Sequence, residues 1–162
     1  MAQSPLAVVQ AVFAAKERND RLMMMALFAE DFAFTFNADP DRIGDGTTLV
    51  GWTANRAHLD RVAQTWEQLD RKVLSMREDA FRADQVNVRI SFVLRHRASG
   101  ETFEGTKRQS WTVRDGIVTS MIEVFDKASV HAVQRLAALS AEPPPPDSVE
   151  QAEGIADGVE DR

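Results

Sequence analysis

Glu123 is the residue whose surroundings point most directly to chemistry, because it stands in the alternating segment MIEVF. Side chains of a β-strand point alternately to opposite faces, so a strand here places Glu123 with Met121 and Phe125. Burial on an apolar face disfavours the charged form of a carboxylate, which can make it an effective acid or base near neutral pH. A purely structural Glu123, paired with Lys107 or Arg108, is equally compatible with the sequence, because buried charges usually have partners.

Several other polar residues can accompany Glu123 in a pocket. Lys107 and Gln109 alternate in step with Trp111 and are predicted to share its face of the sheet. Asn55 and His58 lie on a predicted helix, and a histidine near a pocket carboxylate would form a proton-transfer pair. The candidate catalytic residues are Glu123, His58 and Asp126, and the candidate substrate contacts are Asn55, Lys107, Gln109, Trp111, Met121, Phe125, Phe36 and Phe92.

No metal or cofactor site is predicted. The chain has no cysteine, and its three histidines, His58, His96 and His131, are scattered, with His96 expected to be exposed near a hairpin end. The loop NADPDRIGDGTT carries Asp39, Asp41 and Asp45, but their spacing does not match an EF-hand, so they are expected to be solvated. Phosphate-binding glycine loops and a Gly-x-Ser-x-Gly nucleophile motif are absent.

Length and charge indicate one domain that does not bind nucleic acid. The 162 residues are 44% hydrophobic, which suits a single core. The net charge of -6 disfavours phosphate backbones and anionic membranes. No export signal or membrane span is predicted, so the expected location is the cytoplasm. We expect a folded domain over residues 1–139 and a disordered, acidic, proline-rich tail over residues 140–162.

The helices and strands that position these residues are predicted from the spacing of hydrophobic residues and from capping and turn residues. Ser4 and Asp20 are predicted to cap the first two helices, and Asp115-Gly116 to form a hairpin turn. A strand is expected to follow Glu30-Asp31 directly. The predicted helices run from Pro5, from Arg21 to Ala29, from Trp52 to Leu69 and from Ala128 to Leu139, and the later strands cover 72–81, 85–97, 102–114 and 117–126.

Alternation along the strands also predicts which side chains face inward. The inner set is Val86, Val88, Ile90, Phe92, Leu94, Phe103, Lys107, Gln109, Trp111, Val113, Ile117, Met121, Glu123 and Phe125. The outer face is more polar, with apolar positions at Val93, Ile122 and Val124 that suit a second subunit. A homodimer through this outer face is therefore expected.

The order of these elements resembles the nuclear transport factor 2-like superfamily. The segments LFAEDFAF, GWTANRAHL and WTVRDGIVTSMIEVFD are similar to its SnoaL-like and ketosteroid-isomerase-like bacterial members, over about residues 5–138. The resemblance implies an α+β, cone-shaped (cystatin-like) fold in which N-terminal helices pack on a curved antiparallel sheet that encloses a pocket. It also implies that Glu30 and Asp31 are solvated corner residues.

Asp126 has two possible roles under this resemblance. Its expected role is to cap the following helix by accepting a backbone N–H. In several pocket enzymes that resemble this fold, an acid near this strand end takes part in catalysis, so Asp126 remains the second choice as a catalytic acid.

The resemblance does not extend to ketosteroid isomerase chemistry. That mechanism needs an Asp base and an oxyanion hole made by a Tyr and a protonated Asp, but the chain contains no Tyr. By alignment, the base falls at Phe36, the Tyr near Val12 and the protonated Asp near Gln109. A limonene-epoxide-hydrolase-like Asp-Arg-Asp set cannot be assembled either, because Arg89 is predicted to face outward.

Two functions remain compatible with the sequence. The first is a cofactor-free cyclase, dehydratase or isomerase that acts by acid-base proton transfer on an apolar, carbonyl-bearing substrate, with Glu123 as acid or base and His58 assisting. The second is a non-catalytic ligand-binding or dimeric interaction module of the same fold. In the second, the cone stores a ligand or is simply filled. The expected partners are an apolar small molecule and a second subunit, rather than nucleic acid or a membrane.

Overall fold

The computed structural model describes residues 3–37 and 47–140 of the chain. In chain order the elements are α1 (Pro5–Glu17), α2 (Arg21–Leu27), β1 (Phe28–Asn37), β2 (Thr47–Val50), α3 (Gly51–Thr65), β3 (Trp66–Glu78), β4 (Gln85–His96), β5 (Thr102–Arg114), β6 (Ile117–Phe125) and α4 (Lys127–Ser140). The loop with Asp39, Asp41 and Asp45 and the predicted tail after Ser140 lie outside the described residues.

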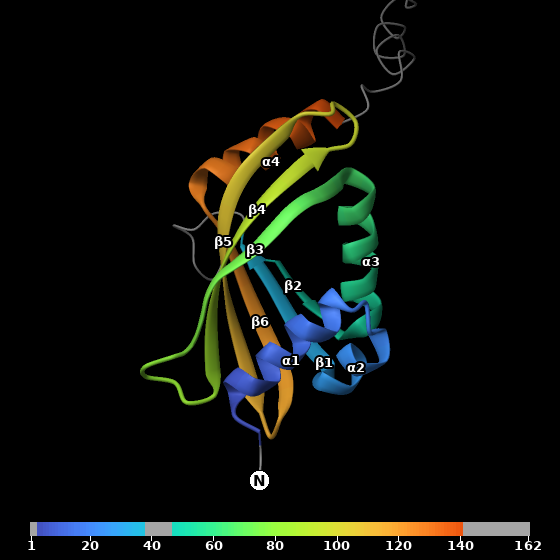
Figure 1. Cartoon of the computed structure of the whole chain (residues 1–162). Coiled ribbons are helices and arrows are strands. Elements are labelled where there is room, and N and C mark those ends of the chain that lie inside the picture. The colour runs from blue at the N-terminus through green and yellow to red at the C-terminus, as the bar shows by residue number, and fades with distance from the viewer. Residues whose placement is uncertain (1–2, 38–46, 141–162) are drawn as a thin grey trace, which may run out of the picture.

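Six strands form one curved, unclosed sheet in the order β2-β1-β6-β5-β4-β3. Neighbouring strands are antiparallel except β1 and β6, which are parallel, so the sheet is mixed rather than antiparallel throughout. Helix α1 contacts β3, β4, β5 and β6, and α3 connects β2 to β3 beside the sheet (Figure 1). The predicted α+β architecture, with N-terminal helices on a curved sheet, is confirmed.

Capping and turn residues in the sequence explain where two helices begin and where one hairpin turns. The Ser4 hydroxyl accepts a hydrogen bond from the backbone N–H of Ala7 at 3.2 Å, and an Asp20 carboxylate oxygen accepts one from Met23 at 3.0 Å. Asp115 and Gly116 both have positive φ, of 51° and 76°, as a two-residue hairpin turn requires. These caps and this turn were predicted correctly.

The boundary between α3 and β3 was predicted wrongly. The helix ends at Thr65, and Trp66 is already extended, with φ -123° and ψ 144°. Trp66 pairs with His96 in the sheet, and its ring packs 4.9 Å from the His96 ring. Tertiary pairing therefore overrides the apolar stripe that suggested a helix as far as Leu69. The short strand β2 was not predicted at all.

Two predictions of burial also need correction. His96 is fully buried rather than exposed, because its ring packs on Trp66 and its Nδ1 lies 2.9 Å from the Ser99 hydroxyl. In β6, Val118 is buried in place of Ile117. The register shifts there, since Thr112 pairs with Ser120 but Val113 pairs with Val118, and this bulge reverses the faces at the start of the strand.

The helix-to-strand junction before β1 lies earlier than predicted. Strand β1 starts at Phe28, so Glu30 and Asp31 lie within it rather than between helix and strand. Both residues are exposed to solvent, as predicted. They take no part in the inner face of the sheet described below.

The core lies between α1 and the inner face of the sheet. Its buried members are Val8, Val9, Val12, Phe13, Phe34, Val86, Val88, Ile90, Trp111, Val113, Val118 and Met121. The predicted inner positions Val86, Val88, Ile90, Trp111 and Val113 are all confirmed as buried. No helix in the described residues is long and apolar enough to cross a membrane.

Helix α4 packs beside the part of β5 that extends past β6. Asp126 caps the helix, and its Oδ1 accepts the Ser129 backbone N–H at 2.8 Å. Ser129 then lies against Gly105 so closely that a Cβ on Gly105 would stand 1.9 Å from the Ser129 hydroxyl and 2.7 Å from the Phe92 ring. Only glycine allows this approach between helix and strand.

Replacement of Gly105 tests this packing. Gly105→Ala is expected to lower the free energy of unfolding by about 2 kcal/mol, because the new methyl group overlaps Ser129 and Phe92. Urea denaturation followed by circular dichroism measures the change. The double variant Gly105→Ala with Ser129→Gly should recover part of the loss, and a Gly105→Ala variant as stable as the wild type would contradict the packing.

Candidate functional site

Glu123 lies on the inner face of β6, with only 7% of its surface exposed. One carboxylate oxygen, Oε2, accepts a hydrogen bond from Gln109 Nε2 at 2.6 Å and lies 3.0 Å from the Lys107 ammonium. The other oxygen, Oε1, has no hydrogen bond to any of the described residues, and 10% of the Glu123 side chain is exposed. The carboxylate is therefore held at one of its two oxygens.

Strand pairing explains why these polar groups meet. Gln109 is the register partner of Glu123, and Lys107 lies two residues before Gln109, on the same face of β5. The Trp111 indole N–H donates to Gln109 Oε1 at 3.1 Å, which fixes the orientation of the Gln109 amide. The result is a polar strip across β5 and β6 within an otherwise apolar inner face.

Aromatic rings surround the Lys107 end of this strip. The Lys107 ammonium lies 5.8 Å from the centroid of the Phe92 ring and 5.4 Å from that of Phe125. Both distances suit cation–π attraction. Phe92 is buried and Phe125 half-buried, so Phe125 retains a surface that a ligand can touch. Met121 and Trp111 are buried in the core beside the strip.

Two cationic residues that the sequence reasoning missed, one exposed and one half-buried, lie within electrostatic range of each other. Arg71 on β3 is the register partner of Phe92, and its guanidinium carbon lies 5.0 Å from the centroid of the Phe13 ring on α1. Lys16 follows Phe13 by one turn of α1. Burial, followed by the charges of Arg71 and Lys107, lowers the pKa of Lys16 from 10.5 to about 8, with Glu123 opposing the change.

Solvent limits the desolvation of Lys16. Much of the residue is exposed, although its ammonium interacts with three charged groups of the inner face. The charges of Arg71 and Lys107 lower the pKa of Lys16 in the same direction as burial. The position of Lys16 could have been predicted from the sequence. It follows Val9, Val12 and Phe13 at helical spacing, and these three residues are buried in α1. Arg71 had no such signal while its strand was predicted to begin at residue 72.

His58 lies near the polar strip but does not contact Glu123 within the described structure. Its ring stacks on Phe36, with centroids 4.6 Å apart, and Phe36 is the register partner of Glu123. Burial, then the charge of Arg61, lowers the pKa of His58, and Glu123 opposes them. His58 thus packs on the residue that stands opposite Glu123 in the neighbouring strand.

Asn55 holds α3 in place. It is the buried residue of α3, and its amide nitrogen donates to the carbonyl oxygen of Gly51 at 2.8 Å and to those of Phe32 and Leu49 at 3.4 Å. These bonds tie the helix to β1 and to the end of β2. Backbone carbonyls therefore accept the hydrogen bonds of the Asn55 amide nitrogen, and its role as a substrate contact stays a prediction.

The Asp126 carboxylate caps the N-terminus of helix α4. Burial acts to raise the pKa of its carboxyl group, but hydrogen bonds from Thr106 and Ser129 outweigh it and lower the pKa.

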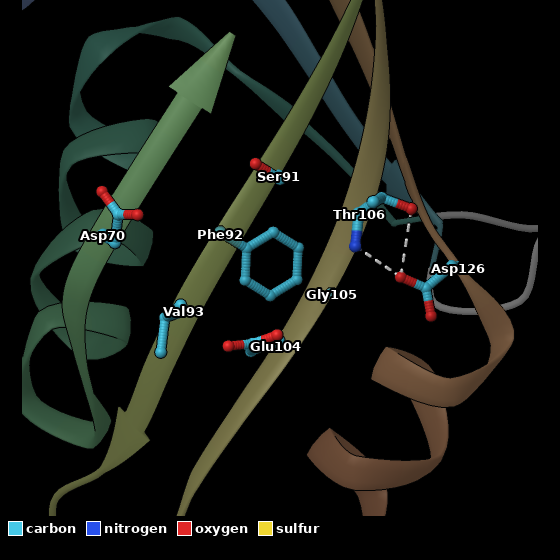
Figure 2. A pocket seen from close by; sticks show the side chains of 8 residues that line it. All are labelled: Asp70, Ser91, Phe92, Val93, Glu104, Gly105, Thr106 and Asp126. Atoms are coloured by element: carbon cyan, nitrogen blue, oxygen red, sulfur yellow. Dashed lines mark hydrogen bonds between the residues drawn. The ribbon is translucent and has the colours of Figure 1, made fainter. Parts of the chain in front are cut away.

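Asp126 borders a hollow of about 380 Å³ shown in Figure 2, together with Asp70, Ser91, Phe92, Val93, Glu104, Gly105 and Thr106. A second hollow, of about 430 Å³, is lined by Arg89, Thr106, Lys107, Arg108, Val124, Phe125 and Asp126. Glu123 lines neither, so Asp126 and Glu123 do not share one of these hollows.

Comparison with known structures identifies the fold. One similar structure is an NTF2-like protein from Burkholderia thailandensis, with a TM-score of 0.64, 23% identity and coverage of 87% of this chain and 99% of that one. The chain has the NTF2-like fold. Another NTF2-like protein, from Burkholderia xenovorans, gives a TM-score of 0.62 at 25% identity and covers 82% and 96% of the two chains.

A third NTF2-like structure carries a functional name. It is a protein from Xanthomonas campestris provisionally named a polyketide cyclase, with a TM-score of 0.60, 20% identity and coverage of 79% of this chain and 94% of that one. No protein-family model and no curated protein matches the sequence. The resemblance to the NTF2-like and SnoaL-like superfamily is thus supported at the level of the fold.

The Lys107–Glu123 pair is expected to couple strongly in stability. Glu123→Gln leaves the Lys107 ammonium without its counter-charge on an apolar face, so we expect a loss of about 3 kcal/mol in the free energy of unfolding. Lys107→Met with Glu123→Gln should be more stable than Glu123→Gln alone. Urea denaturation of the four proteins in this cycle measures the coupling, and additive changes would show that the contact contributes nothing.

Proposed function

We propose that the protein is a cofactor-free cyclase, dehydratase or isomerase that moves a proton on an apolar, carbonyl-bearing small molecule, with Glu123 as the base. The observation that carries this proposal is the asymmetric environment of the Glu123 carboxylate. Lys107 and Gln109 hold Oε2, whereas Oε1 has no hydrogen bond to any of the described residues. A base must be oriented and also free to receive a proton, and this arrangement meets both conditions.

The proposed step begins with a substrate carbonyl compound on the inner face. Glu123 Oε1 accepts a proton from the carbon next to the carbonyl, and the electron pair of that C–H bond moves toward the carbonyl oxygen. Return of the proton at another position gives an isomerised product, whereas attack of the carbanion on a second carbonyl of the same molecule closes a ring. Lys107 and Gln109 keep the carboxylate in place throughout.

The apolar surroundings support a carbonyl compound with an apolar body. Phe36 and Phe125 are half-buried and flank the polar strip, so they can contact a ligand without leaving the core. A structure with 23% identity and a TM-score of 0.60 is that of TerC co-crystallised with polyporic acid, and one from Mesorhizobium loti is provisionally named a SnoaL-like polyketide cyclase. These names agree with the proposed substrate class but leave the reaction of this chain to experiment.

The alternative is a ligand-binding or interaction module of the same fold. The observation that favours it is the same Lys107–Glu123 contact, because a carboxylate already paired at 3.0 Å can serve structure alone. Under this alternative the inner face binds an apolar molecule without turnover. Measurement of proton exchange separates the two functions.

We expect the wild-type protein to catalyse hydrogen–deuterium exchange at the α-carbon of an apolar ketone such as 2-tetralone in D₂O. Glu123→Gln should slow exchange by at least about 100-fold, the usual contribution of a positioned base, whereas Glu123→Asp should retain part of the rate. Mass spectrometry follows deuterium uptake at a temperature where circular dichroism shows each variant folded. Glu104→Gln, which removes an exposed carboxylate from β5, is the matched control. Wild-type exchange no faster than buffer would favour the binding module.

The outer face of the sheet is proposed to form a homodimer. Ile122 is 45% exposed there, and Val93 and Val124 are half-buried, so an apolar patch faces away from the core. Ile122→Glu should weaken the dimer by at least about 100-fold in Kd, because it buries an unpaired charge. Light scattering across a dilution series measures the mass, with Leu22→Glu on α2 as control. A monomeric wild type would remove the proposal.

A further inference from the structure

The outer face of the sheet carries a pair of like charges that stand opposite each other. Arg89 on β4 is the register partner of Arg108 on β5, and both side chains are exposed. Within the described residues, neither arginine forms an ion pair with a carboxylate. Like charges directly opposite in an antiparallel pair are destabilising. A single copy of the chain therefore leaves this basic row without a counter-charge.

An acidic row lies on the same face, four residues away along β5. Glu104 on β5 pairs with Val93 on β4, and Val93 pairs with Asp70 on β3, so the two acidic residues flank an apolar side chain (Figure 2). Both are exposed, and neither carboxylate has an ion pair in the described part of the chain. Residues four apart in a strand share a face, so Glu104 and Arg108 lie about 13 Å apart on it.

The two rows border neighbouring hollows. The hollow of about 380 Å³ is lined by Asp70 and Glu104, and the hollow of about 430 Å³ by Arg89 and Arg108. Thr106 lines both hollows and stands midway between Glu104 and Arg108 in β5. The outer face is therefore hollowed on either side of Thr106, with unpaired carboxylates on one side and unpaired guanidinium groups on the other.

Other charged groups near the two rows are already engaged or lie aside. Asp126 borders both hollows, but its carboxylate accepts the hydrogen bonds that cap α4. Lys107 borders the basic hollow, but its ammonium pairs with Glu123 on the inner face. Lys72 lies between the rows on the edge strand β3 and lines neither hollow. The partners of the two rows must therefore come from outside this copy of the chain.

We propose that two copies of the chain pair through this face, with Glu104 of each copy in contact with Arg108 of the other. A two-fold axis that lies between the two sheets and crosses β5 at right angles near Thr106 exchanges the positions of these two residues. Each dimer then contains the contact twice, and Asp70 and Arg89 lie beside it as the second members of their rows.

The charges favour a second copy as the occupant, because one surface supplies both signs in the order that its own copy requires. They also determine the orientation of the two copies. An axis parallel to β5 would place Arg108 against Arg108 and Glu104 against Glu104, and like charges in contact oppose association. This inference rests on the homodimer proposed above for its partner, and it adds the contacts that orient the two subunits.

Reversal of one charge is expected to break the pairing. Glu104→Arg places arginine against Arg108 of the second copy, and Arg108→Glu places glutamate against Glu104. Each variant should weaken the dimer by at least about tenfold in Kd, because symmetry repeats the unfavourable contact. Sedimentation velocity across a dilution series measures Kd at a temperature where circular dichroism shows each variant folded. Unchanged Kd in both variants would overturn the proposed contacts.

Two combinations should restore association. In an equimolar mixture, Glu104→Arg and Arg108→Glu should form a heterodimer within about threefold of the wild-type Kd, because both contacts then join opposite charges. The double variant Glu104→Arg with Arg108→Glu should form a homodimer for the same reason, at the net charge of the wild type. A tag on one variant lets native mass spectrometry distinguish the heterodimer. Association no tighter than that of the single variants, in both combinations, would overturn the pairing.

Matched changes of charge elsewhere provide the controls. Glu17→Arg at the end of α1 and Arg21→Glu at the start of α2 make the same two substitutions at exposed positions outside the sheet, and neither should change Kd. Since Glu104 lies on the face opposite Glu123, Glu104→Gln stays a suitable control for α-carbon exchange, whatever the oligomeric state.

The outcomes also separate these contacts from the homodimer itself. A wild-type dimer that Ile122→Glu weakens but that neither charge reversal weakens would support the outer-face homodimer and overturn the pairing of Glu104 with Arg108. A monomeric wild type would overturn both. Loss of the dimer in each single variant and its recovery in the mixture would support both.

Discussion

The inner face depends on one constraint, which is that a carboxylate placed among apolar side chains must have a cation within contact distance. Lys107 meets this constraint from the neighbouring strand, and Gln109 adds a hydrogen bond to the same oxygen. Both partners come from β5 because its register with β6 places Gln109 directly opposite Glu123. If that register shifted by one residue, Glu123 would face the outer side and the polar strip would disappear.

Helix α1 gives the inner face its apolar cover. Val9, Val12 and Phe13 bury one stripe of the helix against the sheet, and the exposed Lys16 follows them at the same helical spacing. A helix that packs by one stripe has no freedom to move Lys16 elsewhere without losing the core contacts. The position of this cation is therefore a consequence of packing. The same packing brings Phe13 under the guanidinium of Arg71.

Departures from regular strand geometry determine which residues face the interior at the two ends of the sheet. The bulge in β6 buries Val118 and then returns Met121 and Glu123 to the inner face. At the other end, Gly105 lets Ser129 and Phe92 approach β5, so α4 can lie beside the strand where β6 has ended. Asp126 completes this junction by capping α4 and by accepting the backbone N–H of Thr106.

The sequence by itself determined the alternation of β4 and β5, the turn at Asp115-Gly116, the caps at Ser4, Asp20 and Asp126, and the inward direction of Glu123. These features depend on neighbours within a few residues, through the period of two, positive φ and capping hydrogen bonds. Only the tertiary structure decided that Trp66 begins a strand, that His96 is buried, and that Arg71 lies over the Phe13 ring of α1. These outcomes depend on contacts between elements far apart in the chain, whose energies outweigh local preference and leave no local pattern to find.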